Sequence, residues 1–210
     1  MKTITTGAGK LSSKLLTKLV FLAMFCSSTM AGANEVYIEQ VGDNSAITIT
    51  QDGSSNRIGT ALAPAYIGSG SNTVTIDQVG SGNELDMIVN GAATDVVVDV
   101  LGSNNISTID CGTTASASCN GSFIKQAIAG DDNIVTQNLG GGANHTSEIT
   151  IAGSTNTVTH TSTNTGITSA NITVTGDTNT IGVTQSGTTA KSVTVNSTGN
   201  NNNISINQTN

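Results

Sequence analysis

A step of 23 residues recurs through the C-terminal third of this 210-residue sequence. Glycines and asparagines keep that step at Gly130, Gly153, Gly176 and Gly199 and at Asn133, Asn156, Asn179 and Asn202. Aliphatic residues keep it too, at Val135, Val158, Ile181 and Ile204. A polar chain with few aromatic residues is often disordered, but several classes of position that share one spacing indicate a repeat protein.

Each 23-residue unit contains two short runs in which apolar and polar residues alternate. TNTIGVTQ (178–185) and KSVTVNS (191–197) are one such pair, and SGTT (186–189) and TGNN (198–201) follow them. Alternation with a period of two, bounded by Gly, Ser and Asn, predicts strand, turn, strand, turn. Two short strands cannot bury an apolar face alone, so the units must stack. The sequence therefore predicts an all-β fold, a cross-β, amyloid-like β-solenoid of about seven rungs.

Residues 1–33 have the composition of a secretory leader. Four lysines precede the apolar run LVFLAMFC (19–26), and small residues follow as far as Ala33. The run is too short to span a membrane, so we expect cleavage after Ala33, a secreted protein and a repeat domain over 34–210. Loss of four lysines and no acid changes the net charge from −7 to −11. So acidic a surface repels phosphate, and we expect no nucleic-acid partner.

Two segments interrupt the repeat and are expected to be loops. Residues 60–70 hold the only proline, and residues 111–122 hold Cys111 and Cys119. Two cysteines that enclose seven residues in an exported chain predict a disulfide.

Polar amides recur on the strand face that carries the aliphatic residues, in the pattern [N/S]-x-[V/I]-x-[I/V]-x-Q. In a stack, a buried amide can donate to one neighbouring rung and accept from the other. The alternative is that these amides are exposed. We predict structural ladders of Gln40, Gln51, Gln78, Gln185, Gln208, Asn72, Asn133, Asn156, Asn179 and Asn202. We predict corner glycines at Gly42, Gly53, Gly80, Gly130, Gly153, Gly176 and Gly199.

The sequence offers little for catalysis or metal binding. His145 and His160 are the two histidines, and no G-x-S-x-G nucleophile motif is present. His160 is equivalent to Val183 and Ile206 in later units, which predicts a core position. We therefore expect no enzyme activity, no metal site and no cofactor.

The segments NSAITITQDGSSN (44–56) and SNTVTIDQVGSGN (71–83) resemble the curlin repeat, in which Ser or Asn is followed six residues later by Gln, then by Gly and Asn. The matching positions are Ser45, Gln51, Gly53 and Asn56, then Asn72, Gln78, Gly80 and Asn83. The resemblance extends over 34–90 and 176–210 and is degenerate between them. Curlins are secreted subunits of bacterial functional amyloid fibres, so the resemblance implies self-assembly, adhesion and a place in the extracellular biofilm matrix.

The resemblance also implies a nucleator subunit and an outer-membrane export pore as partners. The chain departs from the family in two respects. Curlins carry a Gly-rich segment, read by the pore, before the first repeat, whereas here NEVYIEQ (34–40) begins at the expected cleavage site. Curlins also lack a cysteine loop such as 111–119.

Both ends of the expected stack lie inside a repeat, without a helix, proline or charge cluster. Such ends can template further copies, and head-to-tail stacking grows a fibre. The alternative is a monomeric secreted β-solenoid, either a surface adhesin or an ice-binding module. TVTHTSTNT (157–165) and ITVTGDTNTIGVT (172–184) place threonines at two-residue spacing, although Gly182 interrupts the row after Thr159.

Overall fold

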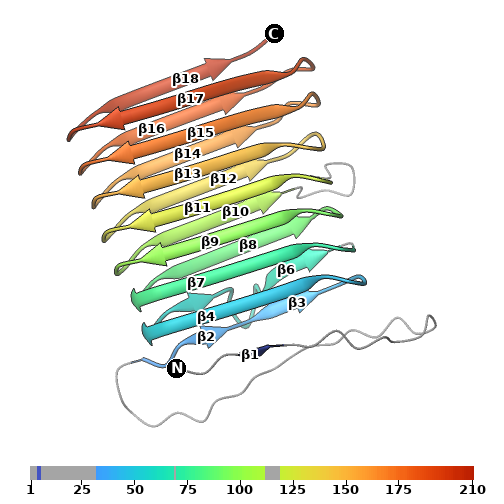
Figure 1. Ribbon diagram of the computed structural model, residues 1–210, viewed down its shortest axis with the longest axis vertical. Helices are drawn as coiled ribbons and strands as arrows, with labels where there is room; N and C mark the ends of the chain where they lie inside the picture. Colours follow the sequence, from blue (N-terminus) through green and yellow to red (C-terminus); the bar gives the residue numbers. More distant parts are fainter. Residues whose placement is uncertain (1–3, 6–31, 69, 112–118) are drawn as a thin grey trace.

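The computed structural model describes residues 4–5, 32–68, 70–111 and 119–210. Over these residues the protein is all β, and its parallel strands stack into a solenoid of about seven turns, which confirms the predicted fold class. Figure 1 shows two layers of strands, with the arrows of one layer running opposite to those of the other. Successive turns follow one another along the long axis of the molecule.

Each turn contributes one strand to each of two sheets. The first sheet contains, in order, β1 (Ile4–Thr5), β4 (Ala46–Ser54), β7 (Thr73–Ser81), β9 (Asp95–Leu101), β11 (Phe123–Ala129), β13 (Thr146–Ala152), β15 (Thr168–Thr175) and β17 (Lys191–Thr198). The second contains, in order, β18 (Asn203–Gln208), β16 (Thr180–Gln185), β14 (Thr157–Ser162), β12 (Ile134–Leu139), β10 (Ile106–Cys111), β8 (Glu84–Asn90), β5 (Arg57–Ile58) and β2 (Glu35–Val36), with β6 (Ala65–Gly68) and β3 (Ile38–Gln40) beside them.

The strands pair in parallel, so that equivalent residues of successive turns lie over one another. Val135, Val158 and Ile181 are aligned in this way across β12, β14 and β16, and each is at most 1% exposed. Alternate residues of both sheets point into the space between the layers, as the period-two pattern predicts. The core is therefore a set of aliphatic columns that run along the stack.

The corner after each first-sheet strand has a fixed backbone shape. Gly153 has a φ of 141°, and two residues later Thr155 has a φ of 60°. A Cβ at Gly153 would lie 2.1 Å from the carbonyl oxygen of Gly176 in the next turn, so only glycine allows the turns to approach this closely. We call this turn the glycine corner.

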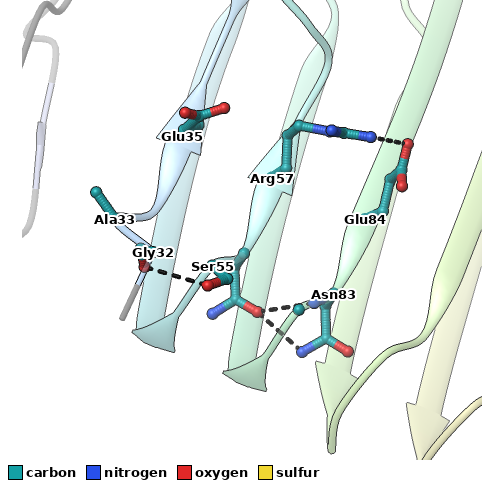
Figure 2. A pocket seen from close by; sticks show the side chains of 9 residues that line it. Gly32, Ala33, Glu35, Ser55, Arg57, Asn83 and Glu84 are labelled. Carbon is teal, nitrogen blue, oxygen red and sulfur yellow. Dashed lines mark hydrogen bonds and ion pairs between the residues drawn. The ribbon is translucent and has the colours of Figure 1, made fainter. Parts of the chain in front are cut away.

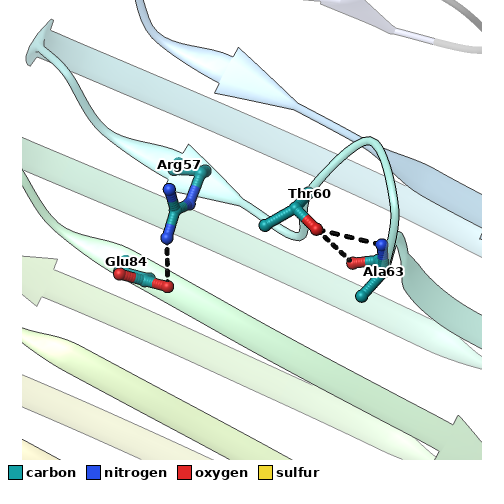
Figure 3. A network of polar contacts seen from close by, with 4 residues as sticks. All are labelled: Arg57, Thr60, Ala63 and Glu84. Carbon is teal, nitrogen blue, oxygen red and sulfur yellow. Dashed lines mark hydrogen bonds and ion pairs between the residues drawn. The ribbon is translucent and has the colours of Figure 1, made fainter.

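The structure corrects the loop predicted at 60–70. Residues 65–68 form β6, which pairs with β3 and β8, and both Ala65 and Ile67 are fully buried. The excursion is a short turn, in which the backbone N–H of Thr60 donates to the carbonyl oxygen of Ala63 at 2.8 Å (Figure 3). The other predicted loop, 111–122, falls largely on residues 112–118, outside the described residues.

The predicted leader also lies mostly outside the described residues. Ile4 and Thr5 form β1, which pairs with β4 opposite Ile49 and Thr48, and this is the one antiparallel pairing among the described strands. No described segment forms a helix of the length and apolarity that a membrane span requires.

Candidate functional site: the amide ladders

An asparagine occupies the end of every glycine corner. We define the asparagine ladder as Asn34, Asn56, Asn83, Asn105, Asn133, Asn156, Asn179 and Asn202. In each of the described turns, Oδ1 of one member accepts the backbone N–H of the next member at 2.9–3.1 Å. The ladder therefore runs through the whole described stack.

Asn133 illustrates how one side chain is saturated. Its Nδ2 donates to Oδ1 of Asn105 at 3.0 Å and to the carbonyl oxygen of Gly153 at 2.9 Å. Its Oδ1 accepts the backbone N–H and the Nδ2–H of Asn156 at 3.0 and 3.1 Å. The residue is fully buried, so its position demands a donor and an acceptor on one short side chain. Asparagine is the residue that meets this demand.

The sequence identified half of this ladder. The 23-residue step gave Asn133, Asn156, Asn179 and Asn202. It missed Asn34, Asn56, Asn83 and Asn105, because unequal turn lengths separate them by 22, 27, 22 and 28 residues from their successors. The motif G-x-x-N at 53–56, 80–83, 102–105, 130–133, 153–156, 176–179 and 199–202 would have found all but the first.

Asn72 lies outside the asparagine ladder, at the opposite corner of the turn. Its Oδ1 accepts the backbone N–H of Thr94 at 3.0 Å, and its Nδ2 donates to the carbonyl oxygen of Gly68 at 2.7 Å. Later turns place Ser122 and His145 at this corner, where the hydroxyl of Ser122 accepts the backbone N–H of His145. The residue type varies at this corner, so no continuous amide ladder forms there.

The predicted glutamines form two separate pairs rather than one ladder. In the first sheet, Nε2 of Gln51 donates to Oε1 of Gln78 at 2.8 Å. In the second sheet, Nε2 of Gln185 donates to Oε1 of Gln208 at 2.8 Å. Gln40 stacks on Ile67 and joins neither pair.

Gln78 also departs from the expectation that burial leaves no polar atom without a partner. It is fully buried, and the next residue in its column is Val100. Its Nε2 has no hydrogen-bond partner among the described residues. A valine cannot accept the bond, and this is where the first glutamine pair stops.

His160 continues the second glutamine pair into the core. Ser147 Oγ lies 2.7 Å from its Nδ1, and Oε1 of Gln185 lies 3.0 Å from its Nε2. Since Gln185 already donates to Gln208, its Oε1 accepts from Nε2–H and the ring is the Nε2–H tautomer. Burial lowers the pKa of His160 to about 4, against the raising effect of the Gln185 hydrogen bond and with a smaller lowering by His145. The core position predicted for His160 agrees with its complete burial.

The glycine corner contains most of the predicted glycines and one other. Gly53, Gly80, Gly130, Gly153, Gly176 and Gly199 share a column with Gly102. Gly42 does not belong to this column, because it lies in the opposite corner, between β3 and β4, although its φ of 118° is similar. The predicted list was therefore wrong at one position and missed Gly102.

Cys119 is buried and disulfide-bonded. The side chain of Cys111 lies outside the described residues, so its pairing with Cys119 stays a prediction.

An open hollow of about 360 Å³ borders the ladder at its N-terminal end (Figure 2). Its wall includes Glu35 and the ion pair of Arg57 with Glu84, whose side chains are 39% and 41% exposed. Exposed pairs of this kind contribute little stability. The same pair fixes β5 against β8 in Figure 3.

Threonine rows on the outer faces are short. Thr108, Thr136 and Thr159 are aligned across β10, β12 and β14, and Gly182 interrupts the row at β16. No threonine row in the registers of the described strands extends over more than three turns. The outer faces therefore lack a sustained flat array.

These features define a class of protein, a β-solenoid whose turns are fixed by buried side-chain ladders. The family model described as the curlin associated repeat matches residues 30–53, which confirms the resemblance drawn from the sequence. The chain therefore carries a curlin associated repeat over β2, β3 and most of β4, including Asn34 and Gln51. Comparison with curated proteins and with solved structures gives no match.

Proposed function

We propose that this protein is a secreted structural subunit that assembles end to end into amyloid-like fibres of an extracellular or biofilm matrix, where the fibres mediate adhesion and aggregation. The proposal assigns it no catalytic role, no metal and no cofactor. Further copies of the same chain are its principal partners, and a nucleator subunit and an export pore are additional candidates from the curlin resemblance.

The observation that carries the proposal is the repeated ladder itself. Every described turn uses the same backbone hydrogen bonds and the same asparagine bonds to hold the next turn. At the last described rung, Oδ1 of Asn202 has no following asparagine, and the outer edges of β17 and β18 are unpaired. These are the groups that another copy of the stack would satisfy.

The direct test is assembly of the purified protein. We expect filaments in electron micrographs, amyloid-dye binding and a 4.7–4.8 Å reflection along the fibre axis. A protein that stays monomeric in sizing experiments at high concentration would contradict the proposal. Thermal hysteresis in that monomer would favour the ice-binding alternative, which the short threonine rows do not support.

A substitution on the exposed edge sharpens this test. Ile206 points into the core from β18 and is half-buried, whereas its neighbour Asn207 points outward. We expect Ile206→Lys to stop growth, because a lysine in an edge column cannot be buried by the next copy, and Asn207→Lys to leave growth nearly unchanged. Circular dichroism of both variants separates lost growth from lost folding.

A further inference from the structure

The two sheets have unequal numbers of levels among the described strands. In the second sheet β2 and β3 share one level and β5 and β6 share another, which gives eight levels up to β18. The first sheet has seven levels, from β4 to β17, when β1 of the predicted leader is set aside. The stack therefore has an odd number of half-turns, fifteen, and both of its outermost half-turns lie in the second sheet.

An odd number of half-turns restricts how two copies can join. If the next copy has the same orientation, its β2 and β3 stack on β18, and its β4 then lies two strand spacings from β17. That junction leaves an empty strand position, about 9.5 Å between the two backbones, with two unpaired edges. Unpaired backbone groups at a buried junction are costly, so this arrangement is unfavourable.

A half-turn about the long axis removes the vacancy. Rotation by 180° places β2 and β3 of the next copy on β17, and its β4 on β18. Strands of the two sheets run in opposite directions, as Figure 1 shows, so the rotation makes each new pair parallel, like the pairs within one chain. Both sheets then continue without a gap.

The side-chain columns agree with the rotated junction. Between β17 and the next copy, Val193 meets Val36 and Val195 meets Ile38, while Gly199 meets Gly42, whose φ of 118° is close to its own 109°. Between β18 and the next copy, the columns are equally matched: Ile204 meets Ile47, Ile206 meets Ile49 and Gln208 meets Gln51. The apolar residues of these edges are half-buried in the single chain and already pack against the core.

The glutamine pairs supply an independent argument, from the direction of their hydrogen bonds. Gln185 donates forward to Gln208, and Gln51 donates forward to Gln78. The Oε1 atom of Gln51 accepts no hydrogen bond among the described residues, and Nε2 of Gln208 donates to the carbonyl oxygen of Ser192 at an exposed position. In the rotated junction Nε2 of Gln208 faces Oε1 of Gln51. One chain of bonds with a single direction would then join four glutamines across two copies.

We infer that the assembly partner of the β17–β18 end is a second copy of this chain turned by half a turn about the fibre axis, with its β4 on β18 and its β2 and β3 on β17. This inference rests on the proposed function and adds its symmetry. The repeat along the fibre is seven and a half rungs, or about 36 Å per copy. It applies to the chain without the predicted leader, because β1 occupies part of the β4 edge.

Cysteine cross-linking distinguishes the two junctions. Ser205 is exposed on β18, and in the rotated junction it lies beside Thr48 of the next copy, whereas in the unrotated junction it lies beside Tyr37. Neighbouring in-register strands place Cα atoms about 4.8 Å apart, within the range of a disulfide. The experiment uses mature protein, whose first residue is read by mass spectrometry, assembled into filaments and oxidised with diamide. The variants are Ser205→Cys with Thr48→Cys, Ser205→Cys with Tyr37→Cys, and each single substitution.

We expect the Ser205→Cys and Thr48→Cys pair to give covalent oligomers on a non-reducing gel, and the pair with Tyr37→Cys to give no more than the single variants. Filaments that cross-link through Tyr37→Cys, or through neither pair, overturn the half-turn junction and leave the proposed function standing. Absence of filaments from the wild-type protein overturns both. Helical reconstruction supplies a second reading, since a rise of about 38 Å without rotation would mark the unrotated junction.

Discussion

At the scale of single residues, the protein depends on side chains that both donate and accept along the stack. Asn133 uses all of its amide valences and also satisfies the backbone N–H of Asn156. Gln78 uses its acceptor only. The difference follows from the residue in the next turn, so the contribution of a buried amide is a property of its column.

Removal of one ladder amide should therefore be costly. We expect Asn133→Ala to lower the free energy of unfolding by about 3 kcal/mol, because it leaves the buried backbone N–H of Asn156 and Oδ1 of Asn105 with fewer partners. Asn171→Ala is the matched control, since Asn171 is exposed on β15, and it should change stability by less than about 0.5 kcal/mol. Chemical denaturation of the monomer measures both. Equal effects would contradict a structural role for the ladder.

His160 should make stability depend on pH. Its pKa of about 4 in the folded protein lies below the ordinary value of 6.5, so the neutral ring stabilises the fold fully above pH 6.5. That contribution, about 3 kcal/mol, is lost as the pH falls from 6.5 towards 4. We expect His160→Gln to lose less stability than the wild type between pH 7 and pH 4 in denaturation experiments. Identical pH profiles would show that the ring does not control acid stability.

At the scale of elements, the glycine corner sets how closely turns approach. Its glycines have φ values between 109° and 141°, a region that other residues rarely adopt, and the carbonyl oxygen of the next turn occupies the space of a Cβ. The strands between corners tolerate more variation, since their outer faces carry Thr, Asn, Ser, Asp and Lys in no fixed order. The repeat is therefore specified most strictly at its corners.

Two glycine substitutions test this difference. We expect Gly153→Ala to destabilise the fold by about 2 kcal/mol or more, because the new Cβ would meet the Gly176 carbonyl oxygen at 2.1 Å. Gly182→Ala should be neutral or slightly stabilising, because nothing lies within 4 Å of a Cβ there and the residue is inside β16. Thermal unfolding of the two variants gives the comparison. A tolerated Gly153→Ala would contradict the account of the corner.

At the scale of the whole molecule, the parity of half-turns decides how copies join. Fifteen half-turns favour a half-turn between neighbours, whereas an even number would allow copies of one orientation to stack without a vacancy. The symmetry of the fibre is thus a consequence of strand count, not of any one contact.

Removal of residues 199–210 should change that symmetry. The shortened chain keeps β17 and loses β18, which leaves seven levels in each sheet. We expect its filaments to repeat every seven rungs, about 33 Å, with no half-turn between copies. Helical reconstruction of micrographs measures both quantities. A shortened chain whose filaments keep the half-turn would contradict the parity argument.

The sequence by itself determined the fold class, because alternation and a constant 23-residue step leave no other way to bury the aliphatic residues. It also determined the C-terminal half of the asparagine ladder, where every turn has the same length. Only the tertiary structure decided which residues lie over one another elsewhere, since β6 returns to the sheet after a short turn and shifts the spacing of every column before it. Contacts along the stack join residues 22 to 28 positions apart, so unequal turn lengths hide them from a periodic pattern. For the same reason the isolation of Gln40, the unpartnered Nε2 of Gln78 and the odd count of half-turns became visible only when the turns were stacked.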